Sequence, residues 1–221
     1  MLTLAAPGWR DVAVPRPPGR EHYVAFATER WLILYGGAGG GAGAFSDTWA
    51  LELELGAWQR LAVPGPQARS FNADGGGGGV LLDGLGRRWL VVYGGLRGEG
   101  FRDNETWKLG PLEEPLEAWR WHEVQPGFGP QSRLRPMPRF HHTQTVLQGS
   151  TLAVLGGHNF MMRPILQPAL LTLRGDETWE LLEARGAPPS RAYHCAACWR
   201  SRLVVFGGMA PRAFGPSRRA L

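Results

Sequence analysis

The sequence predicts an all-β fold, a β-propeller made of four-stranded sheets, or blades. Three observations lead to this prediction. A short apolar run ends in a Gly-Gly pair four times, with first glycines at Gly36, Gly94, Gly156 and Gly207. Each run belongs to a unit of about 50 residues, the usual length of a propeller blade. The runs are rich in Val, Leu, Trp and Tyr and are bounded by Gly, Pro or Asp, as strands are.

The first half of each unit has a fixed order. An Arg opens the unit and an aromatic residue or His follows shortly after; the four are Arg20, Arg69, Arg139 and Arg191. An opening strand comes next, and a second strand runs into the Gly pair. There the chain is expected to turn tightly beside the closely packed axis of the ring, where a Cβ would clash or φ must be positive.

The second half of each unit is marked by tryptophan. A third strand begins with Trp in two units, at Trp49 and Trp107. A fourth strand carries a Trp in three units, at Trp58, Trp121 and Trp179. We expect these rings to fill the gap between neighbouring sheets. No segment shows the 3.6-residue period and caps of a helix of three turns or more.

Two further expectations concern residues beside the glycines. The runs Gly36–Gly41 and Gly75–Gly79 are predicted to be loop tips. Tyr35 and Tyr93 directly precede Gly pairs at the end of apolar strands, so both rings are expected to be buried.

The order Arg-x-x-His, apolar run, Gly-Gly, Asp-x-Trp and Trp resembles the kelch repeat, and the resemblance covers nearly the whole chain. Two departures stand out: the third unit reads Pro168-Ala169-Leu170 in place of Asp-x-Trp, and Asn72 stands where the fourth unit has His194. The resemblance implies a kelch-type β-propeller, whose loops on one face take a partner segment.

The repeats predict one domain over residues 1–221, with blades at 19–65, 66–128 and 129–188, half blades at 1–18 and 189–208, and a tail at 209–221. Leu2–Val14 matches the second half of a unit, so the two half blades are predicted to form a fourth blade shared between the termini. Such sharing removes free sheet edges. The alternative is a fragment of a larger five- to seven-bladed ring.

Composition argues against nucleic-acid and membrane partners. The net charge is +5, but Lys108 is the only lysine, and the arginines are scattered among acidic residues. No apolar run approaches the roughly 20 residues of a membrane span, and Met1–Ala6 lacks the features of a signal peptide. Two cysteines give no disulfide framework, so we expect an intracellular setting, cytoplasmic or nuclear.

Two groups of residues could carry metal chemistry. Cys195 and Cys198 form a Cys-x-x-Cys, but residues three apart on a strand point to opposite faces, so both are expected to be buried structural cysteines. Four histidines lie at matching places in their units and are expected to bond to the backbone: His22, His141, His142 and His194. We therefore predict no metal, no cofactor and no catalytic residue.

The loops after the Gly pairs differ most among the units, and exposed Phe and Met beside Arg is typical of an adaptable interface. We predict a non-catalytic scaffold or adaptor that binds a protein partner through Arg97, Arg102, His158, Phe160, Met161 and Arg163. The competing interpretation is that Phe160 and Met162 plug the ring or pack between blades. The alternative function is a kelch-like enzyme or metal-dependent factor of the oxidase or specifier type.

Overall fold

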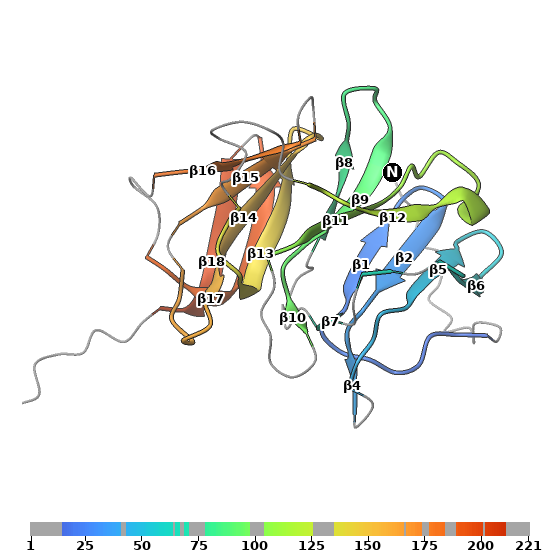
Figure 1. Cartoon of the computed structure of the whole chain (residues 1–221), viewed down its shortest axis with the longest axis horizontal. Helices are drawn as coiled ribbons and strands as arrows, with labels where there is room; N and C mark the ends of the chain where they lie inside the picture. The colour runs from blue at the N-terminus through green and yellow to red at the C-terminus, as the bar shows by residue number, and fades with distance from the viewer. Residues whose placement is uncertain are drawn as a thin grey trace, which may run out of the picture.

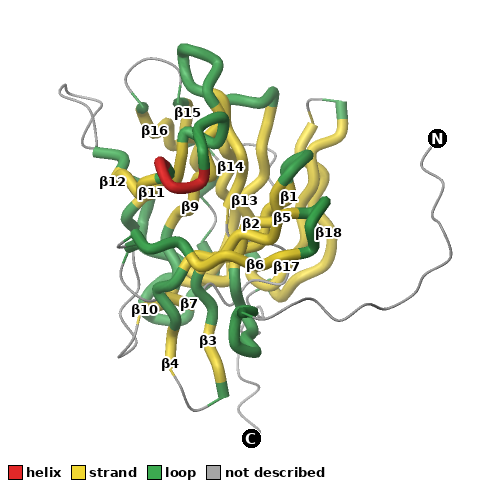
Figure 2. Tube along the Cα trace, turned by 90° about the vertical axis from the view of Figure 1, so that its right-hand side faces the viewer, coloured by secondary structure: helices red, strands yellow, loops and turns green. Residues whose placement is uncertain are grey.

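The computed structural model describes residues 15–40, 43–63, 65–66, 69–70, 78–97, 104–125, 135–165, 167–173, 177–183, 189–200 and 202–210. Strands make up the body of this part of the chain, as Figure 2 shows. Its one helical element is the 3-10 turn η2 (Leu116–Ala118). The expectation that no helix reaches three turns is therefore confirmed within the described residues.

Three four-stranded antiparallel sheets follow one another along the chain, and we call them blades 1, 2 and 3. Blade 1 contains β1 (Val24–Ala27), β2 (Trp31–Tyr35), β5 (Thr48–Glu52) and β6 (Ala57–Arg60). Blade 2 contains β8 (Gly78–Leu82), β9 (Arg88–Tyr93), β11 (Thr106–Gly110) and β12 (Arg120–Glu123). Blade 3 contains β13 (Phe140–Leu147), β14 (Thr151–His158), β15 (Ala169–Thr172) and β16 (Thr178–Leu181).

A fourth sheet has two described strands, β17 (Ala192–Trp199) and β18 (Arg202–Met209), and we call it the half-blade. Two small strand pairs lie outside the blades: β3 (Ala38–Gly39) with β4 (Gly43–Ala44), and β7 (Arg69–Ser70) with β10 (Leu96–Arg97). The predicted completing segment Leu2–Val14 lies outside the described residues. A fourth blade shared between the termini therefore stays a prediction.

The opening strands lie next to one another in chain order: β1 contacts β8, β8 contacts β13, and β13 contacts β17. Each is the end strand of its own sheet, so the other strands of the sheet lead away from this inner row. Figure 1 shows the sheets from blade 1 (blue) on the right to the half-blade (red) on the left. This is the arrangement of a kelch-type β-propeller, as the sequence predicts.

Tryptophans close the contacts between blades, which we call joints. In the joint between blades 1 and 2, the Trp121 ring lies 4.7 Å from the Tyr35 ring, and its Nε1 donates to Thr48 Oγ1 at 3.0 Å. The joint between blades 2 and 3 repeats this arrangement. Trp179 lies 4.9 Å from Tyr93 and donates to Thr106 Oγ1 at 3.3 Å.

The second strand of blade 2 is buried on both faces. Leu90 and Val92 belong to the apolar cluster shared with blade 1, while Val91 and Tyr93 belong to the cluster shared with blade 3. This alternation explains why the strand is apolar throughout and not at every second position. Tyr35 and Tyr93 are both fully buried, which confirms the expectation for the residue before the Gly pair.

The prediction that Gly75–Gly79 is a loop tip is wrong at its end, because Gly78 and Gly79 begin β8 and are buried. A Cβ on Gly78 would lie 2.6 Å from the Val91 carbonyl oxygen, and one on Gly79 would overlap Val146 of blade 3. Glycine here lets the inner strand fit between its neighbours. The other glycine run is also not all loop, since β3 includes Gly39.

The prediction that Cys195 and Cys198 are buried is also wrong, since both thiols are free and exposed. They do lie on opposite faces, because Cys195 pairs with Phe206 and Cys198 with Leu203 in the β17–β18 register. The burial prediction assumed sheets on either side of the half-blade. In the described residues, only blade 3 packs closely against it.

Candidate functional site

The four Gly pairs gather the variable loops at one end of the blades, which we call the doublet face. All eight glycines of the pairs have positive φ, from 66° to 105°. In each pair the chain leaves its strand in a conformation that disfavours other residues. The loop that follows each pair therefore starts at this face.

At one repeat position of the same face, three non-glycine residues also have positive φ: His22 (56°), His141 (57°) and Tyr193 (58°). Each lies two residues after the Arg that opens its unit. This conformation is uncommon for residues with large side chains. It recurs at one repeat position, so it belongs to the repeat and is not particular to one unit.

An aromatic and imidazole cluster forms where blade 3 meets the half-blade. His141 stacks on Tyr193 with ring centroids 3.9 Å apart, and its Nδ1 lies 3.2 Å from Nδ1 of His158. Phe140 contacts both imidazoles. Burial, with smaller contributions from His158 and His22, lowers the pKa of His141 to about 4. His141 is therefore uncharged at neutral pH, and the stacked rings form a base for the adjoining loop.

The loop after Gly157 is a tight turn held by Asn159. The Asn159 Oδ1 accepts the backbone N–H groups of Met161 (2.9 Å) and Arg163 (3.0 Å), and its backbone N–H donates to the Arg163 carbonyl. A bridge between His158 and Pro164 closes the turn at its base. Asn commonly fixes turns in this way. Asn159 was therefore a signal in the sequence from which this turn could have been predicted but was not.

This turn presents apolar side chains to solvent. Phe160 is 63% exposed and Met161 is 57% exposed, and Met162 is similarly exposed. The competing interpretation, in which Phe160 and Met162 plug the ring or pack between blades, is therefore wrong for the described structure. Large apolar side chains that remain exposed on a constrained turn are typical of a contact surface.

The other predicted binding residues are placed differently. His158 is buried in the cluster, and Arg163 is exposed beside Met162. Arg97 lies in β10 and forms an ion pair with Glu105, so it helps to hold the blade 2 loop. Arg102 lies outside the described residues.

Two of the four histidines, His141 and His194, bond to side chains and not to the backbone as predicted, whereas the Tyr93 backbone does contact His142. His141 bonds to His158, and His194 Nε2 lies 2.9 Å from Thr143 Oγ1. Side chains of the neighbouring strand or loop replace the backbone partner. Within the described ranges, no three His, Cys, Asp or Glu side chains come close enough to hold a metal ion.

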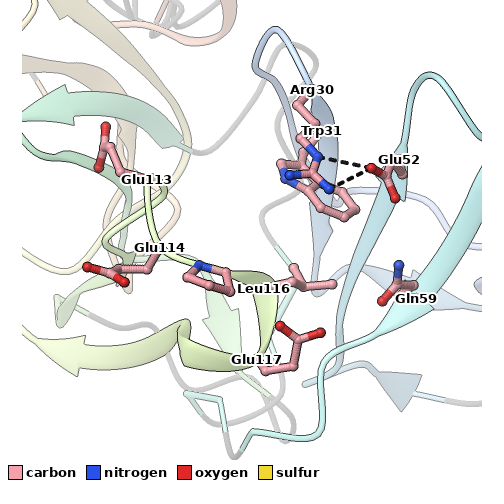
Figure 3. A pocket seen from close by; sticks show the side chains of 9 residues that line it. Arg30, Trp31, Glu52, Gln59, Glu113, Glu114, Leu116 and Glu117 are labelled. Atoms are coloured by element: carbon pink, nitrogen blue, oxygen red, sulfur yellow. Dashed lines mark hydrogen bonds and ion pairs between the residues drawn. The ribbon is translucent and has the colours of Figure 1, made fainter.

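A separate hollow lies at the opposite end, between blade 1 and η2 (Figure 3). Its volume is about 260 Å³, and its walls carry four glutamates, Glu52, Glu113, Glu114 and Glu117. Arg30 already pairs with Glu52 at 2.7 Å and lies over the Trp31 ring. Arg30 thus already occupies part of the position that a basic side chain of a partner would take beside these glutamates.

The chain matches no protein-family model. It is 31% identical to Adagio protein 3 of Arabidopsis thaliana over 216 residues, which cover 95% of this chain and 32% of the relative. It is 29% identical to an F-box/kelch-repeat protein of the same plant, covering 92% of this chain and 45% of the relative. The chain therefore spans less than half the length of these relatives.

A solved structure shows the same fold. The structure of YjhT matches with a TM-score of 0.67 over 93% of this chain and 64% of that one, at 15% sequence identity. At that identity the likeness extends to the fold alone. Among the described residues, no helix is long and apolar enough to cross a membrane.

Proposed function

Because the chain belongs to the kelch-repeat family of β-propellers, we propose that it is a non-catalytic module that binds a protein partner through the doublet face. The observation that carries this proposal is the turn at residues 159–163. It holds Phe160 and Met161 in solvent on a backbone fixed by Asn159. A fixed turn loses little conformational freedom on binding, so its apolar area contributes more to affinity.

Arg163 completes the proposed contact. Its side chain is exposed, and it makes no ion pair with any described residue. An arginine beside apolar anchors suits a partner that offers a carboxylate next to a hydrophobic segment. Arg102, outside the described residues, remains a proposed second contact.

The arginines elsewhere support a protein partner over nucleic acid. Several described arginines are paired with carboxylates of the chain itself: Arg20 with Asp47, Arg30 with Glu52, Arg87 with Asp83, Arg88 with Glu113, and Arg97 with Glu105. Neutralised arginines contribute little to the phosphate contacts on which nucleic-acid binding depends. We propose no nucleic acid and no membrane among the partners.

The likeness to an F-box/kelch-repeat protein suggests that the module recruits a client into a larger assembly. We propose an intracellular setting, cytoplasmic or nuclear, which fits the two exposed free thiols.

The alternative is a metal-dependent or oxidase-type factor. Its best support is the His141–His158 pair, whose Nδ1 atoms lie 3.2 Å apart. Two nitrogens alone do not make a catalytic metal site, which needs about three protein ligands. Metal analysis of the purified protein decides between the two functions, because stoichiometric copper, iron or zinc contradicts a module that only binds protein.

A pull-down tests the proposed face. The double variant Phe160→Ser, Met161→Ser should lose the partner that the wild type recovers, and Arg163→Ala should weaken recovery. The matched control is Leu55→Ser, Leu85→Ser, which changes two exposed leucines in the β5–β6 and β8–β9 turns at the opposite end. Recovery that is equal for the wild type and the Phe160/Met161 variant would refute the face.

A further inference from the structure

The arginines that open the units share one hydrogen bond. In three units the Nη1 atom donates to the carbonyl of the first doublet glycine: Arg20 to Gly36 (3.0 Å), Arg139 to Gly156 (3.2 Å) and Arg191 to Gly207 (2.8 Å). The guanidinium therefore takes the same place in each of these three units. What differs between units is the group that meets its second nitrogen.

In blade 1 a carboxylate meets the guanidinium. Asp47 accepts from Arg20 Nη1 at 2.6 Å and from Nη2 at 3.0 Å. This two-point pairing neutralises a nearly buried cation. It also holds the pKa of Asp47 below its usual value, although burial of the carboxyl acts in the opposite direction.

Blade 3 has no acid at the matching position. Trp49 pairs with Leu34, and Ala169 pairs with Val154, where Leu34 and Val154 each lie two residues before a Gly pair. Counting back two residues along each third strand aligns Asp47 with Gln167. The blade 3 unit has thus replaced the carboxylate by a neutral side chain.

This replacement leaves Arg139 without a carboxylate partner in the part of the chain that the structure describes. Its side chain has no solvent-accessible surface, its Nη1 bonds to the carbonyls of Gly156 and Gln167, and its Nη2 has no hydrogen-bond partner. No carboxylate among the described residues pairs with it. Burial lowers its pKa, which the nearby Tyr93 opposes. An uncompensated buried cation is strongly destabilising, so a counter-charge is expected at Nη2.

A second orphan donor lies close by, on His142. The Gln144 amide is oriented by Tyr93, whose N–H donates to Oε1 and whose carbonyl accepts from Nε2. The Gln144 Nε2 also lies 3.0 Å from His142 Nε2, and an amide nitrogen can only donate. His142 Nε2 must therefore accept, so the ring proton is on Nδ1, which has no partner.

Three side chains with an unpartnered nitrogen, Arg139, His142 and His194, lie around the Gly pair of blade 3. Arg139 bonds to the Gly156 carbonyl, a Cβ on Gly156 would lie 2.6 Å from His194 Cε1, and a Cβ on Gly157 would lie 2.8 Å from His142 Cβ. His194 also has an unpartnered Nδ1. The unpartnered groups include a buried cation and a neutral N–H donor, and this combination suits an anion.

We propose that a small monovalent anion such as chloride binds beside the Gly pair of blade 3, on the side that faces Tyr93 of blade 2, held by Arg139 Nη2 with His142 Nδ1–H as a second donor. The anion takes the electrostatic role that Asp47 has in blade 1. The proposal is independent of the doublet-face function, since Arg139 is buried and no partner side chain is required to reach it.

Thermal unfolding in chloride and in gluconate at equal ionic strength tests this proposal, because gluconate is too large for a buried site. We expect the wild-type midpoint to be about 3 °C higher in chloride, a shift reached when chloride exceeds its Kd roughly tenfold. Broadening of the chloride NMR signal by the protein gives a direct measure of binding.

Two variants make the test specific. Gln167→Asp restores the acid of blade 1 beside Arg139, so it should raise the midpoint in gluconate and remove the chloride effect. Asp47→Asn takes the acid from Arg20 and should make the chloride effect larger. Equal wild-type midpoints in the two salts, or a chloride effect that survives unchanged in Gln167→Asp, would overturn the site.

Discussion

The opening hairpins of blade 3 and of the half-blade are built in the same register. His142 pairs with Gly156 in blade 3, and His194 pairs with Gly207 in the half-blade. Both hairpins join two eight-residue strands. Their surroundings differ, because blade 3 lies between two sheets and the half-blade has blade 3 on one side.

The difference appears in the residues that precede and line the Gly pair. Leu155 of blade 3 is 6% exposed, whereas Phe206, at the same position of the half-blade, is 80% exposed. One step further from the turn on the same face, Ala153 is 4% exposed and Val204 is 50% exposed. The half-blade thus has an apolar face of the same kind but without a covering sheet in the described residues.

The comparison also separates the roles of the two glycines. A Cβ on Gly157 or on Gly208 would lie 2.7 Å from a carbonyl oxygen of its own hairpin. A Cβ on Gly156 would instead overlap the Arg191 carbonyl of the next sheet, while one on Gly207 would meet nothing within 4 Å. The backbone of the hairpin itself therefore requires the second glycine, and the close contact with the next sheet requires the first.

The largest effect is expected where a joint is already formed. Trp179→Ala removes a buried ring that packs on Tyr93 and donates to Thr106, and should lower the free energy of unfolding by about 4 kcal/mol. The control is Trp199→Ala in the half-blade, an exposed ring whose loss should cost about 0.5 kcal/mol. Urea unfolding measures both. Similar losses for the two variants would break the comparison.

The next largest effect tests the two roles of glycine. Gly156→Ala should cost about 3 kcal/mol, because its side chain is forced into a left-handed conformation and against the Arg191 carbonyl. Gly207→Ala has the same strained φ but open space around it, and should cost about 1 kcal/mol. Equal costs in urea unfolding would mean that backbone strain alone explains the pair.

A smaller effect concerns acid. Burial, reinforced by the charges of Arg139 and His194, lowers the pKa of His142 to about 3. The stability that neutral His142 contributes is complete above its unfolded pKa of about 6.5, and it is lost as pH falls toward the folded value. Lowering the pH to about 5 should therefore cost about 2 kcal/mol through this group.

Hydrogen exchange measures where this acid effect acts. We expect β13 and β17 to lose protection at mildly acidic pH before β1 and β2, since the pKa values of His141 on β13 and His194 on β17 are also lowered to about 4. His142→Gln should reduce the dependence on pH. Loss of protection that begins in blade 1 would contradict the assignment to these two strands.

The parts of the fold that were predictable from the sequence are those fixed within one unit. The Gly pairs, the buried Tyr35 and Tyr93, and the Trp in each of the two joints between blades 1, 2 and 3 recur at constant places. Repetition makes each of these weak local signals strong. The exposure of Phe160 and Met161 agrees with what the composition of their loop indicated, while their role in binding stays a prediction.

The parts that were missed depend on what a neighbouring unit supplies. The sequence around Gly79 predicts a loop, and only the contact with Val146 of blade 3 explains why glycine stands in a strand there. The sequence around Cys195 predicts a buried residue, but no sheet covers it in the described residues. In the sequence alone, Gln167 indicates no function. Its neutral side chain becomes significant only because the structure places the buried Arg139 beside it. Inter-blade contacts join residues far apart in sequence, so local patterns carry little information about them.

The smallest expected effect, that of Phe206→Ser, tests whether the exposed apolar face of the half-blade is covered in solution. Leu155→Ser should cost about 3 kcal/mol in the buried joint. Phe206→Ser should cost no more than about 0.5 kcal/mol if its face stays exposed as in the described residues, and about as much as Leu155→Ser if the predicted fourth blade covers it. Both variants replace an apolar residue that precedes a Gly pair by the same polar one, so the unfolded states change alike. A cost for Phe206→Ser close to that for Leu155→Ser would show that the face is covered in solution. The predicted fourth blade requires that result, since a closed ring brings blade 1 against this side of the half-blade.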